Sequence, residues 1–195
     1  MSLIRPLLPA LALPLVFSIP ANGLGPELLV GGDFESLHAK SALPEGWATA
    51  FIPDTKKHVK FAAVEGSGRD EGHAASITVL DTHPADKKVA YNWHRKIEGL
   101  EPGKLYVMDG WVRSEDLAST AFAMLQFWGP EGRMLGGARC EDRFPILGTQ
   151  DWTHMATIFR VPEGMDHARI RIGMSTQTEK EGTVWFDDFS VRELE

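Results

Sequence analysis

The sequence has a single cysteine, Cys140, among its 195 residues. One cysteine cannot form an internal disulfide, a cysteine-rich zinc site or a CxxC redox pair. Basic residues are also outnumbered, because 20 lysines and arginines stand against 27 aspartates and glutamates, which gives a formal net charge of −7. A basic surface spread over the whole domain, as in proteins that bind nucleic acid or anionic lipid, is therefore not expected, and no nucleic-acid partner is predicted.

Catalytic sequence motifs are missing as well. The chain contains no GxSxG, HExxH, GxxxxGK[ST] or GxGxxG pattern. Its seven histidines never stand at i, i+2 or i, i+4 spacing from one another, which disfavours a zinc catalytic centre. Cys140 would need a nearby histidine to act as a nucleophile, and the sequence does not locate one. We therefore predict no catalytic residues, and we expect a binding protein rather than an enzyme.

Long hydrophobic runs are absent after the first 23 residues. Residues 1–23 combine Arg5, an uncharged apolar run over 6–17 and the small residues Ala21-Asn22-Gly23, a pattern typical of a secretory signal peptide. The apolar run is shorter than the ~20 residues needed to span a bilayer, and prolines interrupt the segment. We expect export to the periplasm, the cell surface or the medium, without a membrane span.

The rest of the chain, 24–195, alternates between apolar and polar residues with period two, which predicts half-buried strands. Glycine- and proline-rich turns separate these segments. A helical pattern is not found, apart from one short helical turn expected at 114–119. The absence of repeats and linkers favours a single domain, and the many short strands favour an antiparallel sandwich or barrel, an all-β fold. The expected strands are 77–79, 89–97, 105–112, 121–128, 154–159, 167–174 and 184–191, with loops or short edge strands at 52–60 and 81–88.

Six short motifs carry a resemblance to a known family. In chain order they are ELLVGGDFE at 27–35, GW at 46–47, GLEPGKLY at 99–106, GWVR at 110–113, DWT at 151–153 and GTVWFDDFSV at 182–191. Their order and spacing resemble the galactose-binding-like jelly rolls, in particular the cellulase-associated carbohydrate-binding modules of the family 4, 9 and 22 type. Gly31 and Gly32 depart from the Asn-Gly that is usual in the family. The resemblance implies an antiparallel β-sandwich that binds polysaccharide or oligosaccharide without cleaving it.

The resemblance also implies a structural calcium ion where the two ends of the chain meet. Glu35 and Asp187 are the expected ligands, and either Asp33 or Asp188 adds an oxygen or a supporting contact. Calcium takes six to eight oxygen ligands, which carboxylates and backbone carbonyls supply. Asp187 and Asp188 are neighbours, so on a strand they point to opposite faces and are not expected to bind one ion together. The alternative is that these carboxylates are solvated or cap backbone N–H groups.

Sugar binding by such a module needs aromatic rings for the apolar faces of the sugar and polar side chains for its edges. Trp47, Trp111, Trp152 and Trp185 fall at family positions that pack the core. Two tryptophans with polar or turn neighbours, Trp93 and Trp128, are the expected aromatic platform, with core packing as the alternative. The expected polar contacts, each of which could instead be a solvated strand residue, are Asn92, His94, Gln126, Arg139 and Glu141.

The sequence therefore predicts an exported, non-catalytic module that binds a glycan on the concave sheet. Modules of this kind are usually attached to an enzyme, so a separate glycan-active enzyme is an expected partner. One alternative is a structural or protein-binding sandwich that uses loops such as 53–60. The other is a small glycan-active hydrolase or lyase, which would need two carboxylates, or a base and an arginine, in one pocket.

Overall fold

A computed structural model of the chain describes residues 23–50, 57–82, 90–140, 145–175 and 180–195. Almost all of the predicted signal peptide, 1–22, and the predicted contact Glu141 lie outside these residues. No helix in the described part of the chain is long and apolar enough to cross a membrane. The secondary structure there is antiparallel β with one short 3-10 turn at Pro130–Gly132, so the predicted all-β fold class is confirmed.

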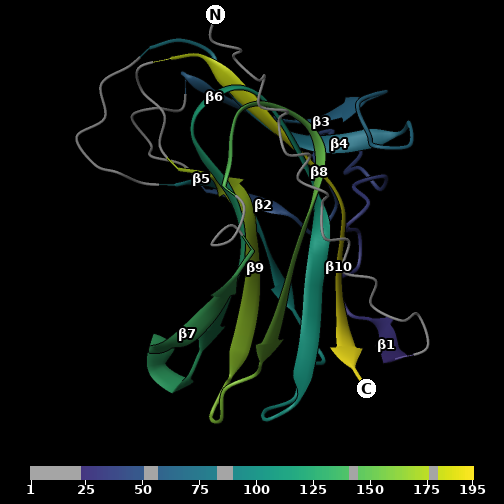
Figure 1. Ribbon diagram of the computed structural model, residues 1–195, viewed down its shortest axis with the longest axis vertical. Coiled ribbons are helices and arrows are strands. Elements are labelled where there is room, and N and C mark those ends of the chain that lie inside the picture. The colour runs from purple at the N-terminus through teal and green to yellow at the C-terminus, as the bar shows by residue number, and fades with distance from the viewer. Residues whose placement is uncertain (1–22, 51–56, 83–89, 141–144, 176–179) are drawn as a thin grey trace, which may run out of the picture.

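The strands form two layers that share one long strand, β6 (Leu105–Trp128) (Figure 1). The first sheet has the order β2-β5-β9-β6-β7 and uses the C-terminal part of β6; its other strands are β2 (Ala48–Ala50), β5 (Tyr91–Ile97), β9 (His167–Met174) and β7 (Met134–Arg139).

The second sheet has the order β3-β4-β10-β6-β8 and uses the N-terminal part of β6. Its other strands are β3 (Val59–Glu65), β4 (His73–Val79), β10 (Gly182–Leu194) and β8 (Ile146–Arg160), and β1 (Leu24–Glu27) pairs with the end of β10. This sandwich is the predicted architecture.

Strand β6 differs from the predicted secondary structure in two details. The segments 105–112 and 121–128 are parts of one strand, and the helical turn expected at 114–119 is wrong. Asp116 adopts a left-handed backbone conformation, with φ of 52°, and the register against β8 shifts at Ser114 and Leu117. Irregularities of this kind bend a strand without ending it. The bend lets one strand leave the second sheet and enter the first.

The core lies between the two sheets and is built from alternate strand residues. Ile170 and Ile172 on β9 face Val184 and Phe186 of the opposite sheet's β10 across this core, and all four side chains are fully buried. The predicted core position of Trp47 is confirmed, because its ring is buried and its indole N–H donates to the carbonyl of Gly31 over 2.8 Å.

The two ends of the described chain lie side by side, β1 next to the C-terminal part of β10 (Figure 1). One carboxylate fastens them: Glu27 accepts hydrogen bonds from the backbone N–H of Val191 at 2.9 Å, the Ser190 hydroxyl at 2.6 Å and the Arg192 Nε at 3.0 Å. This arrangement brings the segments that carry Glu35 and Asp187 to the same region of the fold.

Candidate ligand-binding face

The outer face of the first sheet gathers most of the predicted polar contacts. Because side chains alternate along a strand, the buried Tyr91, Ile170 and Leu125 place their strand neighbours outside. We define the first-sheet face by these outer positions: Asn92, His94 and Lys96 on β5, His167, Arg169, Arg171 and Gly173 on β9, Phe122, Met124, Gln126 and Trp128 on β6, and Met134, Gly137 and Arg139 on β7. Asn92, His94, Gln126 and Arg139 thus share one face, as predicted.

The centre of this face is Arg171, which the sequence analysis did not select. Its Nε donates to the Gln126 side-chain oxygen at 2.7 Å, and its second nitrogen donates to the Asn92 side-chain oxygen at 3.0 Å. Asn92 is itself buried and donates to the Ala90 carbonyl at 3.1 Å. The guanidinium is therefore held in one orientation by two of the predicted residues.

The electrostatic environment of this face is positive. Burial lowers the pKa of the Arg171 guanidinium, and the neighbouring charge of Arg169 lowers it further. Burial likewise lowers the pKa of the His94 imidazole, with added repulsion from Arg169 and Arg171. His94 lies directly opposite Arg171 in the β5–β9 register, so the two side chains are close enough to interact electrostatically.

Trp128 lies at one end of the same face, as predicted. Its ring is parallel to that of its cross-strand neighbour His167, with ring centroids 6.3 Å apart and an interplanar angle of 8°. The stacked pair lies beside the polar residues, and a polar cavity of about 240 Å³ adjoins it, sharing Lys96 and His167 with the face. The cavity's two carboxylates are exposed: Glu98 forms an ion pair with Lys96, and Asp166 contacts the His167 imidazole at 2.9 Å.

Trp93 is not on this face, and its predicted role as a sugar platform is wrong. The side chain is fully buried, its indole N–H donates to the Ser76 carbonyl at 3.3 Å, and its ring meets Phe61 edge-on at 5.2 Å. The reason is the alternation of β5. Since Asn92 and His94 point outward, the residue between them has to point into the core.

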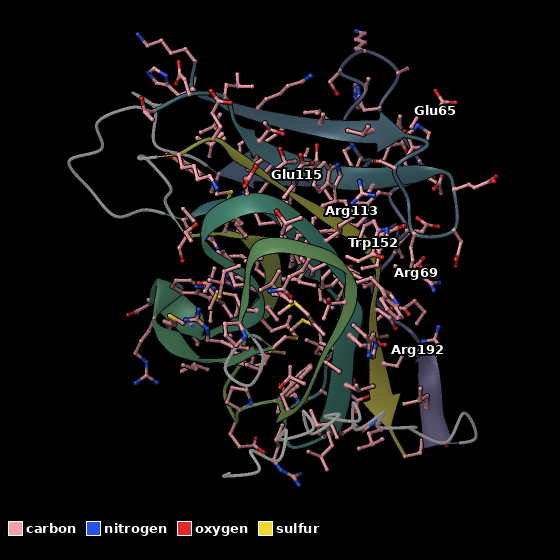
Figure 2. All side chains as sticks on the ribbon, turned by 45° about the horizontal axis from the view of Figure 1, so that its top comes forward. Glu65, Arg69, Arg113, Glu115, Trp152 and Arg192 are labelled. Atoms are coloured by element: carbon pink, nitrogen blue, oxygen red, sulfur yellow. The ribbon has the colours of Figure 1, made fainter. Side chains whose placement is uncertain are left out.

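Three tryptophans that were predicted in the core lie instead on the outer face of the second sheet, where they are partly exposed. Arg113 stacks between two of them, with its guanidinium carbon 5.3 Å from the Trp152 ring and 4.3 Å from the Trp185 ring. Arg69 lies 4.8 Å over the third, Trp111. Figure 2 shows Arg113, Trp152 and Arg69 on one side of the molecule. These guanidiniums cover ring faces that a sugar would otherwise use.

The predicted calcium ligands Glu35 and Asp187 meet at the turn between β3 and β4. Glu35 accepts hydrogen bonds from the backbone N–H of His73 at 2.7 Å and from its imidazole at 3.0 Å, and this side-chain bond is the main cause of a lowered Glu35 pKa. Asp187 is buried and accepts from the backbone N–H of Arg69 at 2.7 Å. Burial raises the pKa of Asp187 to about 6, and the nearby charges of Asp188 and Glu35 contribute.

The other two predicted ligands turn away from this pair. Asp188 is exposed and forms an ion pair with Arg69 at 2.8 Å, while Asp33 is exposed and accepts only from the Glu35 N–H, at 3.4 Å. Within the described ranges, no group of three or more acidic, histidine or cysteine side chains is close enough to hold a metal ion. Glu35 and Asp187 fit an oxygen-ligand site in part, and any further ligands would have to be backbone carbonyls or water.

No sequence family and no curated protein matches the chain. Its fold is similar to the CBM22-1 xylan-binding domain of Xyn10C from Paenibacillus barcinonensis, with a TM-score of 0.60 and 13% identity over 89% of this chain and 97% of that domain. It is also similar to TmCBM61 in complex with β-1,4-galactotriose, with a TM-score of 0.51 and 15% identity over 86% of this chain and 98% of the module.

A third similar structure is the enzymatically active domain of tailspike protein 4 from bacteriophage CBA120, with a TM-score of 0.56 and 16% identity over 84% of this chain. This chain spans only 20% of the tailspike chain, so the likeness concerns a part of that protein. Identities of this size establish the fold and not the ligand. The chain has the jelly-roll β-sandwich fold of carbohydrate-binding modules, in agreement with the resemblance of its sequence motifs.

Proposed function

We propose that the protein is an exported, non-catalytic module that binds a polysaccharide or oligosaccharide on the first-sheet face and works beside a separate glycan-active enzyme. The observation that carries the proposal is the arginine fixed at the centre of this face. Arg171 is held by Gln126 and Asn92 and so presents hydrogen-bond donors without a further ordering cost. The similar structures include modules whose names specify xylan and galactotriose.

Trp128 supplies the apolar part of the proposed site. A sugar ring has an apolar CH face that packs against an indole, while its hydroxyl groups need polar partners at the edge of the ring. Trp128 and His167 form a parallel pair on the same face as Arg171, so both kinds of contact are available on adjacent strands. The second sheet is a weaker candidate, because Arg113 occupies ring faces of Trp152 and Trp185.

Replacing Trp128 by alanine should reduce glycan binding while leaving the fold intact. The loss of one stacking contact is worth about 1 kcal/mol, which corresponds to roughly a fivefold weaker affinity. The measurement is a pull-down and affinity titration of the mature chain, 24–195, against a panel of insoluble and soluble polysaccharides. Trp152→Ala is the matched control, because it removes a tryptophan from the opposite face and should leave the affinity unchanged.

Three other outcomes of this assay would contradict the proposal. A folded protein that binds no glycan would favour the structural or protein-binding alternative. Release of reducing sugar during the incubation would favour the hydrolase or lyase alternative. Equal losses in the Trp128 and Trp152 variants would remove the first-sheet face from the site.

We also propose that Glu35 and Asp187 hold a structural calcium ion, together with backbone carbonyl oxygens of the β3–β4 turn. The support is that both carboxylates border this turn: a Cβ added to Gly72 would lie 2.2 Å from a Glu35 oxygen, and one added to Gly68 would lie 3.2 Å from an Asp187 oxygen. A cation would offset the repulsion between the two carboxylates and would tie the turn to the final strand.

Chelation should then lower the thermal midpoint of unfolding. A ligand present at a hundred times its dissociation constant stabilises a protein by about 2.7 kcal/mol, equivalent to roughly 5–10 °C for a chain of this size. The midpoint is measured by calorimetry with calcium and with EDTA, for the wild type and for Asp187→Asn. The calcium-dependent difference should vanish in the variant. An unchanged wild-type midpoint would mean that these carboxylates only cap backbone N–H groups.

A further inference from the structure

The charge on the first-sheet face differs from that of the protein as a whole. The chain has a formal net charge of −7. Yet none of the outer positions on β2, β5, β9, β7 and the C-terminal part of β6 carries a carboxylate, within the residues that the structure describes. The same positions carry four cationic side chains, those of Lys96, Arg139, Arg169 and Arg171. An acidic protein has thus concentrated positive charge on one sheet.

Two of these cations have no anionic partner among the described residues. Arg171 donates only to the neutral amide oxygens of Gln126 and Asn92. Arg169 is two residues earlier on the same strand and points to the same side, and it forms no ion pair. Lys96, in contrast, is already paired with Glu98. The mutual repulsion of the two arginines contributes to the lowered pKa of Arg171, as expected of charges that nothing nearby neutralises.

The two arginines are partly exposed, and glycines occupy two of the outer positions near them. Gly173 follows Arg171 at the next outer position of β9, and Gly137 stands opposite Gln126 on β7. Neither residue raises a side chain above the sheet. Gly173 is buried against Tyr91 and Asn92, so it offers no hollow, but both guanidinium groups are themselves partly exposed to a ligand. One end of the face is bounded by the Trp128–His167 pair.

We propose that the glycan bound by this face is acidic, a polysaccharide whose carboxylate or sulfate groups pair with Arg169 and Arg171. The inference rests on the proposed function and names its ligand class. A planar guanidinium forms two parallel hydrogen bonds to a carboxylate or a sulfate, and such charge-assisted pairs are about twice as strong as neutral hydrogen bonds. A ligand spanning both arginines would gain two such pairs, while its sugar rings would lie against Trp128.

The test compares acidic glycans with neutral forms of the same backbone. One arm pairs polygalacturonate with its methyl ester, and the other pairs dextran sulfate with dextran, so that the arms separate carboxylate from sulfate as the recognised group. Affinity should be highest for the acidic member of one pair, and it should fall as salt rises from 50 to 300 mM. Polyglutamate, a polyanion without sugar, should bind more weakly than the preferred acidic glycan.

The variants are Arg169→Gln, Arg169→Lys and Lys60→Gln. Arg169→Gln should weaken binding of the acidic glycan by about tenfold, as expected for the loss of a hydrogen bond to a charged group. Arg169→Lys should recover part of the loss because it keeps the charge. Lys60 is exposed on β3 of the other sheet, so Lys60→Gln makes the same change in net charge and should alter the affinity less than twofold. Thermal midpoints confirm that each variant is folded.

Three results would overturn the inference: equal affinity for the acidic and neutral member of both pairs, equal losses for Arg169→Gln and Lys60→Gln, or equal affinity for polyglutamate. Tight binding of the neutral glycans would leave the proposed function standing. Failure of the folded protein to bind any glycan, acidic or neutral, would instead contradict the proposed function itself.

Discussion

Replacing Trp93 by alanine is expected to lower the free energy of unfolding by about 4 kcal/mol, in the range found for buried aromatic residues cut back to alanine. The ring is fully buried between the sheets and packs edge-on against Phe61. The substitution leaves a large cavity and removes the donor from the Ser76 carbonyl, a buried acceptor that then loses a hydrogen bond.

The measurement is urea denaturation followed by tryptophan fluorescence and circular dichroism. Trp128→Ala is the control, because its partly exposed ring stacks on His167 and its loss should cost about 1 kcal/mol or less. The two variants should therefore have different defects. Trp93→Ala should lose stability, and Trp128→Ala should lose glycan affinity. A Trp93→Ala protein of wild-type stability would contradict the core position of this residue.

The position of Trp93 could have been predicted from the sequence. Period two assigns Asn92 and His94 to one face and Tyr91 and Trp93 to the other, so the three residues Asn92, Trp93 and His94 cannot all contact one ligand. The polar neighbours of Trp93 favoured exposure of the whole segment. Applied strictly, the same alternation also places Arg169 and Arg171 outside, while their position beside His94 follows from the β5–β9 register that the structure shows.

The second-sheet tryptophans were harder to place, for a physical reason. Trp185 is flanked by Val184 and Phe186, so both faces of this strand are apolar and alternation does not tell which one is buried. The partner that settles the question is Arg113, whose guanidinium lies over the Trp185 ring from a neighbouring strand. A contact between residues 72 positions apart depends on the register of two strands, and one sequence does not reveal it.

The sequence predicted the order of the strands better than it predicted the residues of the candidate site. The six motifs predicted the jelly roll because turns and core positions recur along the whole chain, and the structure confirms it. Strand β7 was missed because Gly136 and Gly137 interrupt its alternation, and the edge strand β3 was only partly anticipated, because it overlaps the end of the stretch 52–60 where a loop or a short edge strand was expected. Glycine has low strand propensity, so strand pairing with β6 rather than local preference defines β7.

Replacing Gly173 by alanine is the substitution expected to disturb the first sheet most. A Cβ at this position would lie 2.1 Å from the Tyr91 carbonyl oxygen and 2.6 Å from the Asn92 Cβ, on the strand that pairs with β9. Backbone cannot move aside as a flexible side chain can, so β5 and β9 have to separate locally. The expected loss is about 3 kcal/mol of unfolding free energy, at the upper end of the usual cost of overpacking.

Gly136→Ala is the matched control, because a Cβ there would meet no other atom within 4 Å. In that variant the reduced entropy of the unfolded chain should leave stability unchanged or raise it by up to about 1 kcal/mol. Urea denaturation of both proteins measures the effect: the free energy of unfolding should fall in the Gly173 variant and should not fall in the Gly136 variant. The Gly173 variant should also lose glycan affinity, since Asn92 helps to hold Arg171 and lies at the point where the strands are pushed apart. A Gly173→Ala protein with wild-type stability and binding would show that the β5–β9 pair tolerates the added methyl group. The positions of Asn92 and Arg171 would then not depend on the close approach of β5 to Gly173.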